Sequence, residues 1–170
     1  PLTKQLRSAG RDFYTDVGEI FASFGAAIYC LDDLSTIYIC NGDKKLLNRM
    51  KEFGFKLGSR LEEKYIGVYP ANISNKTGDY SKMIGEEHPL DFFSDLCSIA
   101  TVTNGELYSQ NRHIEEKHLH ALLIIMPLES YSENTERMCR IMIERLLATI
   151  SNDSLYMRYG RLFTLTEDIS

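Results

Sequence analysis

The residues best suited to chemistry gather between positions 80 and 97. This segment mixes apolar and aromatic side chains with a few polar ones, as small-molecule pockets do. A glutamate or a histidine there can hold a polar or cationic group through a charge-assisted hydrogen bond, and aromatic rings suit an ammonium as well as an uncharged molecule. Together with one upstream tyrosine, the candidate ligand-binding residues are Tyr69, Tyr80, Met83, Glu87, His88, Phe92, Phe93 and Cys97.

The same residues also have a plainer interpretation. His88 and the glutamates beside it are then solvated loop residues, and Phe92 and Phe93 belong to the hydrophobic core. The sequence leaves both interpretations open.

Four cysteines are a second candidate source of chemistry: Cys30, Cys40, Cys97 and Cys139. They lie far apart without a C-x-x-C pair, which argues against a zinc ribbon and against a disulfide-stapled module. The first three fall on expected strands, so that folding could join them with His88 in a metal or thiol-redox site. Small buried hydrophobic residues would explain them equally well. We expect no metal and no cofactor.

Three histidines, at positions 113, 118 and 120, stand in a polar, mixed-charge stretch. His118 and His120 would share one strand face, yet an exposed connection explains them more simply. The sequence contains no glycine-rich phosphate loop and no Gly-x-Ser-x-Gly motif. We therefore expect a protein that is not an enzyme.

The bulk composition limits the class of protein. A length of 170 residues suits one domain, and 44% hydrophobic with 25% charged residues is typical of a globular chain. A net charge of −5 disfavours direct nucleic-acid binding, which requires several phosphates to be neutralised. Strongly apolar runs such as residues 121–126 are far shorter than a membrane span. We expect a cytoplasmic protein without a membrane segment.

The elements that must position the candidate residues begin with an amphipathic helix within residues 2–24. Its apolar residues recur at offsets of three and four. An antiparallel hairpin with strands at 26–31 and 36–40 follows, and then a helix between Asp43, a suitable N-cap, and Gly54, a suitable stop.

Residues 55–95 have weak periodicity and contain six of the glycines and prolines that interrupt regular structure. We expect short helices within 63–76 and a strand near 79–84. Long irregular segments inside a compact domain usually carry function. Two core strands, at 96–102 and 118–126, follow around a polar connection.

A strong amphipathic helix is expected at 133–150. Its stripe either covers the sheet or forms a dimer seam, and the two roles are compatible. The fold class that follows is α+β, with a central, mainly antiparallel sheet and the N- and C-terminal amphipathic helices packed on one face. The stripe consists of Met138, Ile141, Met142, Leu146 and Ile150.

Several short motifs carry a resemblance to a known family. They are Gly25-Ala-Ala-Ile-Tyr, Ile39-Cys-Asn-Gly-Asp, Glu62-Glu-Lys-Tyr-Ile-Gly, Gly85-Glu-Glu-His and Asp95-Leu-Cys-Ser-Ile-Ala. Over about residues 20–150, the chain resembles the GAF domain at the N-terminus of sigma-54-dependent activators, the group that includes acetoin and dihydroxyacetone regulators. It departs from that family after Gly67, where it has Val-Tyr-Pro-Ala, and at Asn104-Gly105, which a polar insertion follows.

The resemblance implies a GAF-like sensor domain over residues 1–156, followed at 157–170 by a tail or linker to an output domain outside this chain. It implies a regulatory domain of a bacterial transcription regulator that binds a small-molecule metabolite. Binding would be coupled to a rearrangement of a homodimer and its terminal helices, and the covalently linked output domain would hold the ATPase and DNA-binding functions.

Two alternatives remain open. One is a ligand-free dimerisation or interaction module, in which side chains fill the pocket. The other is a thiol-redox sensor or enzyme that uses Cys97 with Cys30 or Cys40, and it requires an exposed thiol with a low pKa.

Overall fold

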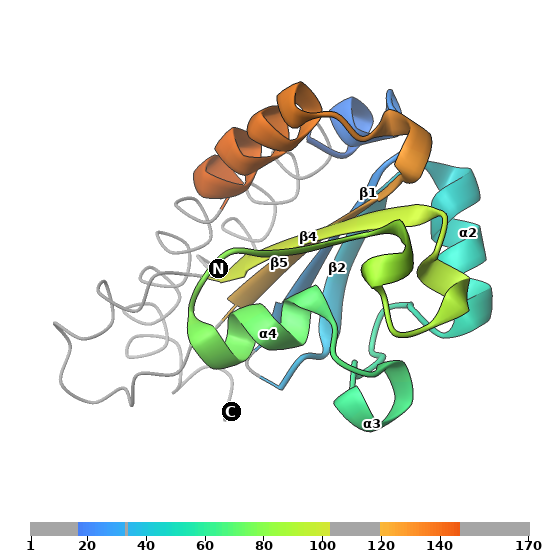
Figure 1. Ribbon diagram of the computed structural model, residues 1–170, viewed down its shortest axis with the longest axis vertical. Helices are drawn as coiled ribbons and strands as arrows, with labels where there is room; N and C mark the ends of the chain where they lie inside the picture. Colours follow the sequence, from blue (N-terminus) through green and yellow to red (C-terminus); the bar gives the residue numbers. More distant parts are fainter. Residues whose placement is uncertain (1–16, 33, 103–119, 147–170) are drawn as a thin grey trace, which may run out of the picture.

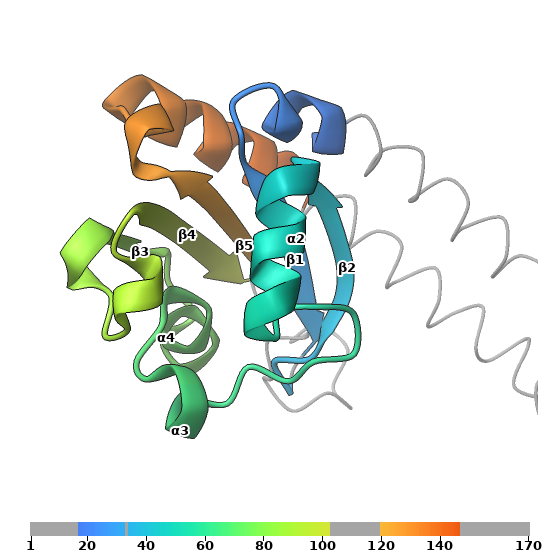
Figure 2. The ribbon, with the colours of Figure 1, turned by 90° about the vertical axis from the view of Figure 1, so that its right-hand side faces the viewer.

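The computed structural model describes residues 17–32, 34–102 and 120–146. Their core is a five-stranded antiparallel sheet with the strand order β2-β1-β5-β4-β3 (Figures 1 and 2). Three short 3-10 turns are η1 (Gly85–Glu87), η2 (Asp91–Phe93) and η3 (Leu128–Ser130). The strands and helices are β1 (Ala27–Asp32), β2 (Ile37–Gly42), α2 (Lys44–Phe53), α3 (Glu63–Ile66), α4 (Pro70–Thr77), β3 (Ser81–Ile84), β4 (Leu96–Val102) and β5 (His120–Pro127).

The sheet is the middle of three layers (Figure 1). Helices α2, α3 and α4 cover one face, and the helical residues 17–22 and 133–146 cover the other. The expected α+β fold, with a mainly antiparallel sheet and both terminal helices on one face, is confirmed. Since strand side chains alternate between faces, an apolar run that is buried throughout, such as residues 121–126, requires cover on both sides.

The two faces differ in composition, and we name them accordingly. The aromatic face lies under α2, α3 and α4, and its strand residues are Ala27, Tyr29, Leu31, Leu96, Ser98, Ala100, Val102, Ala121, Leu123 and Ile125. The aliphatic face lies under the terminal helices, and its strand residues are Ile28, Cys30, Cys97, Ile99, Leu122, Ile124 and Met126.

Helix α2 is bounded by the residues that the sequence predicted. The Asp43 carboxylate accepts a hydrogen bond of 3.0 Å from the Leu46 amide, which would otherwise lack a partner in the first turn. Gly54 ends the helix with φ of 118°, in the left-handed region that glycine adopts without strain. Leu46 and Met50 face the core. Both predicted caps are confirmed.

Part of each edge of the sheet is protected. At the β2 edge, the Ile37 amide donates to the Ser59 carbonyl at 2.9 Å, and the Gly58 amide donates to the Ile37 carbonyl at 2.8 Å. At the other edge, β3 has only four residues, and its exposed Lys82 pairs with Glu136 at 2.6 Å. Short edge strands and edge lysines hinder the addition of further strands.

The stripe predicted on the last helix is partly wrong. Met138 and Ile141 are 38% and 54% exposed. The residues that cover the aliphatic face are Cys139, Ile143 and Leu146, with Met142 partly buried beside them. The apolar residues of this helix therefore occupy two sides, and only one of them faces the sheet.

Other predictions lie outside the described residues. These are the polar connection with His113 and His118, the residue Ile150 and the tail at 157–170. His120 begins β5, opposite Asp32 of β1. Within the described ranges, no helix is long and apolar enough to cross a membrane.

Candidate functional site

A cluster of rings fills the space between α2, α4 and the β3–β4 connection, which we define as residues 85–95. Phe92 stacks on Phe53 with 4.1 Å between ring centroids, and Phe93 lies 5.1 Å from Tyr69. Small residues of the sheet beneath, such as Ala27 and Ala100, leave room for the rings. We call this set the aromatic cluster, and its members are Phe53, Phe55, Tyr69, His88, Phe92 and Phe93.

A chain of buried polar groups runs beneath these rings. His88 Nδ1 lies 2.8 Å from the Gly85 carbonyl oxygen, and Nε2 lies 2.9 Å from Ser98 Oγ. The Tyr69 hydroxyl lies 2.7 Å from the same Ser98 oxygen. Tyr69 and Ser98 are fully buried, and His88 is nearly so. The chain thus ties α4 and the β3–β4 connection to the middle of β4.

The hydrogen-bond directions in this chain follow from its fixed end. A carbonyl can only accept, so Nδ1 of His88 carries the proton and donates to Gly85. In the neutral imidazole, Nε2 then accepts from the Ser98 hydroxyl, and Ser98 Oγ in turn accepts from the Tyr69 hydroxyl. Each donor proton along the His88–Ser98–Tyr69 chain is used once. The arrangement therefore requires no charged group.

Burial reinforces this neutral state. It lowers the pKa of His88 below its ordinary value, although the bond to the Gly85 carbonyl and the nearby charge of Glu87 act in the opposite direction. Burial also raises the pKa of Tyr69, and the hydrogen bond to Ser98 offsets only part of that effect. At neutral pH the imidazole and the phenol both stay uncharged.

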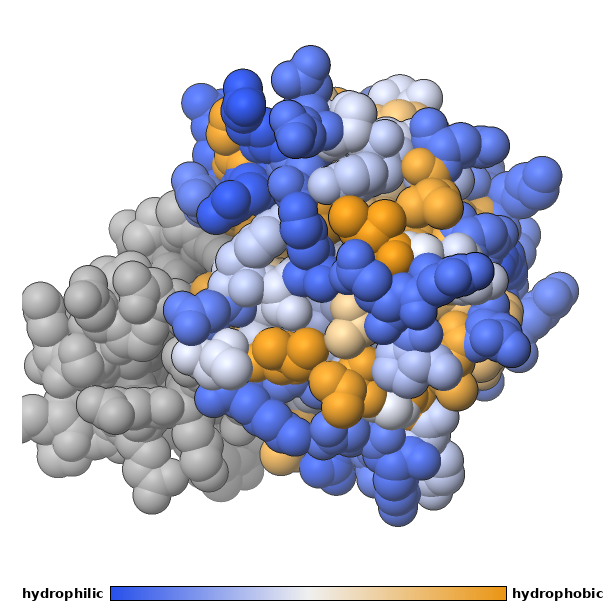
Figure 3. Space-filling model, in the orientation of Figure 1, coloured by the Kyte–Doolittle hydropathy of each residue, from blue (hydrophilic) through white to orange (hydrophobic). Residues whose placement is uncertain are grey.

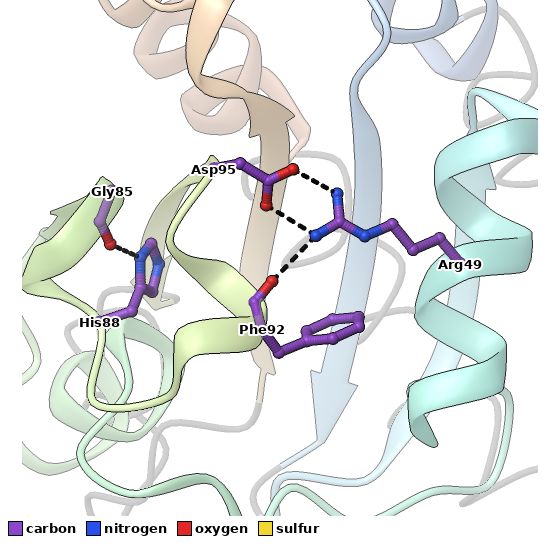
Figure 4. A network of polar contacts seen from close by, with 5 residues as sticks. All are labelled: Arg49, Gly85, His88, Phe92 and Asp95. Carbon is purple, nitrogen blue, oxygen red and sulfur yellow. Dashed lines mark hydrogen bonds and ion pairs between the residues drawn. The ribbon is translucent and has the colours of Figure 1, made fainter.

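Arg49 of α2 clamps the β3–β4 connection from outside (Figure 4). Its two terminal nitrogens donate to the carboxylate oxygens of Asp95 at 2.9 and 2.6 Å, and one of them also donates to the Phe92 carbonyl at 2.9 Å. The guanidinium carbon lies 5.0 Å from the centroid of the Phe92 ring. Hydrogen bonds from Arg49 hold the pKa of Asp95 below its ordinary value. The clamp fixes the rim of the aromatic cluster.

The structure brings half of the predicted site residues together. Tyr69, His88 and Phe93 form the buried centre of the aromatic cluster, and the partly buried Phe92 lies at its rim. Met83 is partly buried on the edge strand and pairs with Ser98 in the register. The solvated-loop interpretation is thus wrong for His88 and correct for the exposed Glu87.

Tyr80 does not belong to this centre. Its ring packs on the aliphatic face, its hydroxyl donates to Glu136 at 3.2 Å, and the Arg140 guanidinium lies 4.3 Å from the ring centroid. A hollow of about 50 Å³ beside it is lined by Tyr80, Thr101, Arg140, Ile143 and Glu144, which is too small for a metabolite. The prediction grouped residues by sequence proximity, whereas the sheet separates them.

Cys97 also lies on the aliphatic face, next to Cys139. Burial raises the pKa of both thiols to about 12, and the pKa of the fully buried Cys30 thiol is raised further. Such thiols form little thiolate, the reactive species. The partly exposed Cys40 packs on the opposite face from Cys30 and Cys97.

The metal site considered from the sequence is therefore not assembled. Cys30 and Cys97 are separated by the sheet from Cys40 and His88. Across the described part of the chain, no three His, Cys, Asp or Glu side chains come close enough to hold a metal ion.

Sequence reasoning missed Ser98, which joins His88 to Tyr69, and the Arg49–Asp95 clamp. A signal for Ser98 existed, because a serine between Cys97 and Ile99 is a polar residue inside a mostly apolar strand. The clamp gave no such signal, since its partners are 46 positions apart.

Buried polar residues concentrate on one side of the sheet. Within the described ranges, those that are buried are Asn72, Ser74, His88 and Ser98. Each belongs to α4, to the β3–β4 connection or to the aromatic face of β4. The terminal helices cover an apolar surface instead. Among the described residues, the buried polar groups therefore lie on the aromatic side of the sheet.

Comparisons with known proteins agree with this fold. No protein-family model matches the sequence, and no curated protein matches it. A chain of the crystal structure of the E. coli DhaR(N)-DhaL complex superposes with a TM-score of 0.71 at 18% identity, over 98% of this chain and 55% of that one. The GAF domain/HD domain protein from Geobacter sulfurreducens superposes with a TM-score of 0.51 at 11% identity, over 91% of this chain and 92% of that one.

These likenesses concern the fold alone. This chain spans about half (55%) of the length of the DhaR(N)-DhaL chain that it matches. The fold expected from the sequence motifs, a GAF-like α+β domain, is confirmed by that superposition and by the antiparallel sheet.

Proposed function

We propose that this chain is a small-molecule-sensing regulatory domain of a bacterial transcription regulator that acts in the cytoplasm. A ligand would bind on the aromatic face, beneath α4 and the β3–β4 connection. The observation that carries the proposal is the His88–Ser98–Tyr69 chain, a buried polar centre in a layer that is otherwise held by ring contacts.

The route from the ligand to the terminal helices runs through β4. Ser98 of this strand faces the polar centre, whereas its neighbours Cys97 and Ile99 face the aliphatic side, where Cys139 and Ile143 of the last helix lie. A ligand that binds one arrangement of the β3–β4 connection more tightly would shift the population toward it. The terminal helices would then pass this shift to the output domain that we propose outside this chain.

We propose that the domain acts by binding and catalyses nothing. The high pKa values of Cys97 and Cys139 support this for thiol chemistry. The burial of Ser98, whose hydroxyl donates to His88 Nε2, supports it for nucleophilic chemistry, because a substrate could not reach a fully buried oxygen.

The first experiment is a thermal-shift screen of the domain against diols, amino alcohols and quaternary amines. A ligand that prefers the folded state raises the apparent Tm in a saturable way. If no compound of the three classes does so in the well-folded protein, the sensor proposal is wrong.

Two conservative variants then test the site. Tyr69 and His88 are buried, so alanine at either position would remove core packing as well as a polar contact. Tyr69→Phe and His88→Gln keep most of the volume, and we expect each to weaken ligand binding. The matched control is Tyr80→Phe, which removes a hydroxyl from the aliphatic face and should leave the affinity unchanged.

A second candidate function is binding to another protein chain, including a second copy. Apolar side chains interrupt the hydrophilic surface in several patches (Figure 3). On the terminal helices, Ile20, Met138 and Ile141 are exposed by 46%, 38% and 54%. The DhaR(N) structure, moreover, is that of a complex with DhaL. Sedimentation of wild type and Ile141→Glu tests the homodimer, which the variant should dissociate.

A further inference from the structure

His88 fastens the first half of the β3–β4 connection to the sheet. Its Nδ1 donates to the Gly85 carbonyl inside the connection (Figure 4), and its Nε2 accepts from the Ser98 hydroxyl of β4 at 2.9 Å. The imidazole is 6% exposed and stacks on Phe93 with 5.4 Å between ring centroids. The second half of the connection is held separately, by Arg49 of α2.

The hydrogen bonds of His88 fit one protonation state only. The three contacts run from His88 to Gly85, from His88 to Ser98 and from Ser98 to Tyr69. The neutral groups supply three donor protons, one on Nδ1 and one on each hydroxyl, so each contact holds one proton. Protonation at Nε2 adds a fourth and turns the acceptor of the Ser98 hydroxyl into a donor. One buried donor is then left without an acceptor, which is costly.

The surroundings offer the imidazolium no buried counter-charge. The titratable groups near the chain are Tyr69 of α4, Tyr29 of β1 and Cys97 of β4. Burial raises the pKa of each, so all three stay uncharged. Within the connection, the charge that acts on His88 is the carboxylate of the exposed Glu87. A cation without a buried partner is strongly favoured to move into water.

We propose that His88 is a proton-operated latch: when it takes up a proton in mildly acidic solution, residues 85–90 leave β4 while the sheet stays folded. Water then accepts from both N–H groups of the imidazolium. Residues 92–95 stay in place, because Arg49 binds Asp95 and the Phe92 carbonyl independently of this proton. The latch needs no ligand, so it stands or falls separately from the proposed sensing function.

Release uncovers a defined part of the domain. Pro89 packs on Gly67, where an added Cβ would lie 2.9 Å from the proline Cβ. The His88 ring also covers Tyr69, with 5.9 Å between the ring centroids. Both contacts are lost when residues 85–90 move out. Proton uptake is thus coupled to exposure of the segment that leads into α4.

Hydrogen exchange at backbone amides tests the latch in the 170-residue chain. The His88 amide, bonded to the Gly85 carbonyl, reports on the first half of the connection, the Ser94 amide on the second half, and the amides of β5 on the sheet. Below about pH 6.5, we expect the protection of the His88 amide to fall by up to about tenfold per pH unit, after correction for the intrinsic exchange rate. The Ser94 amide should not share this opening.

Dilute urea distinguishes the latch from unfolding of the whole domain. A local opening exposes little surface, so exchange of the His88 amide should hardly respond to urea, whereas exchange of the β5 amides should accelerate. If the His88 amide shows the urea dependence of β5 in acid, the proton acts only on global unfolding and the latch is wrong. Protection of the His88 amide that does not change with pH would also overturn it.

Two variants separate the effect of the proton from that of packing. His88→Gln places a neutral polar side chain at this position and should abolish the acid-dependent opening. Should this variant not fold, Glu87→Gln provides the test at an exposed position. Loss of the carboxylate should move the midpoint of the His88 imidazole titration, followed by NMR, to lower pH, because its charge favours the imidazolium. The matched control, Glu86→Gln on the same turn, should shift the midpoint less.

The titration and the exchange must agree. In the wild type the midpoint should lie below the ordinary histidine value of about 6.5, and a midpoint at or above that value would overturn the latch. In Glu87→Gln, the loss of protection at the His88 amide should extend to lower pH together with the midpoint. A midpoint that moves while the loss of protection does not would show that another group drives the opening, and the latch would be wrong.

Discussion

The two faces of the sheet are packed in different ways. On the aliphatic face, the terminal helices place Phe21, Ile143 and Leu146 against strand residues that need no polar partner. On the aromatic face, rings surround a polar chain, and further polar atoms remain without partners. The contrast supports the proposed sensing function, in which one face would contribute stability and the other would bind the ligand.

The largest expected effect is on the aliphatic face. Phe21→Ala empties a fully buried site, so we expect it to lower the free energy of unfolding by about 3–5 kcal/mol. Urea denaturation followed by circular dichroism measures this loss. The control is Ile20→Ala on the exposed side of the same helix, with an expected change within about 0.5 kcal/mol. Equal losses would show that the helix does not pack as described.

The second largest expected loss of stability is on the aromatic face. Ser98→Ala removes few atoms but leaves both the Tyr69 hydroxyl and His88 Nε2 without their partner. We expect a loss of about 1–3 kcal/mol, because buried unpaired polar groups are costly. Ser94→Ala, at an exposed serine of the β3–β4 connection, should be neutral in the same denaturation assay. An unchanged free energy of unfolding for Ser98→Ala would show that the His88–Ser98–Tyr69 hydrogen bonds do not stabilise the domain.

A smaller effect depends on pH. The folded-state pKa of His88 is lowered, so the unfolded chain binds its proton at a higher pH than the folded chain does. The contribution of His88 to the free energy of unfolding is therefore complete above its pKa in the unfolded chain, about 6.5. It declines as the pH falls from there toward the lower pKa of His88 in the folded protein. Denaturation at pH 7.5 and pH 5.5 measures the decline. His88→Gln should reduce it, and an unchanged pH dependence would contradict the buried neutral imidazole.

The smallest effect concerns the clamp at the rim of the aromatic cluster. The Arg49 and Asp95 side chains are 36% and 62% exposed, so solvent screens their attraction. We expect Asp95→Asn to cost about 0.2–1 kcal/mol at low salt, and less in 1 M NaCl. A loss as large as that of Ser98→Ala would mean that the clamp, rather than the buried chain, holds the β3–β4 connection.

Local signals made most of the fold predictable. Asp43 and Gly54 bound α2 through hydrogen bonds to adjacent turns, so neighbouring residues alone specify both ends. The strands were found in the same way, since runs such as residues 121–126 have one apolar residue after another. On the last helix, prediction from the spacing of apolar residues failed for Met138 and Ile141, because tertiary packing selects the face that meets the sheet.

The site was less predictable because it depends on which way each strand residue points. Cys97 and Ser98 are adjacent, yet one faces the terminal helices and the other faces the polar chain. Strict alternation from the buried Leu96 would have assigned Ser98 to the aromatic face. Tyr69 was among the predicted site residues, but its hydrogen-bond partner Ser98 was not, because hydrogen bonds across 29 positions leave no pattern in sequence.

The protected edges of the sheet have a consequence for assembly. Hydrogen bonds to residues 58–60 occupy the start of β2, and the four-residue β3 bears an ion-paired lysine. A second copy that paired with the start of β2 or with β3 would have to break these arrangements before the two sheets could merge. These features therefore hinder fibre-like growth at the start of β2 and along the short β3.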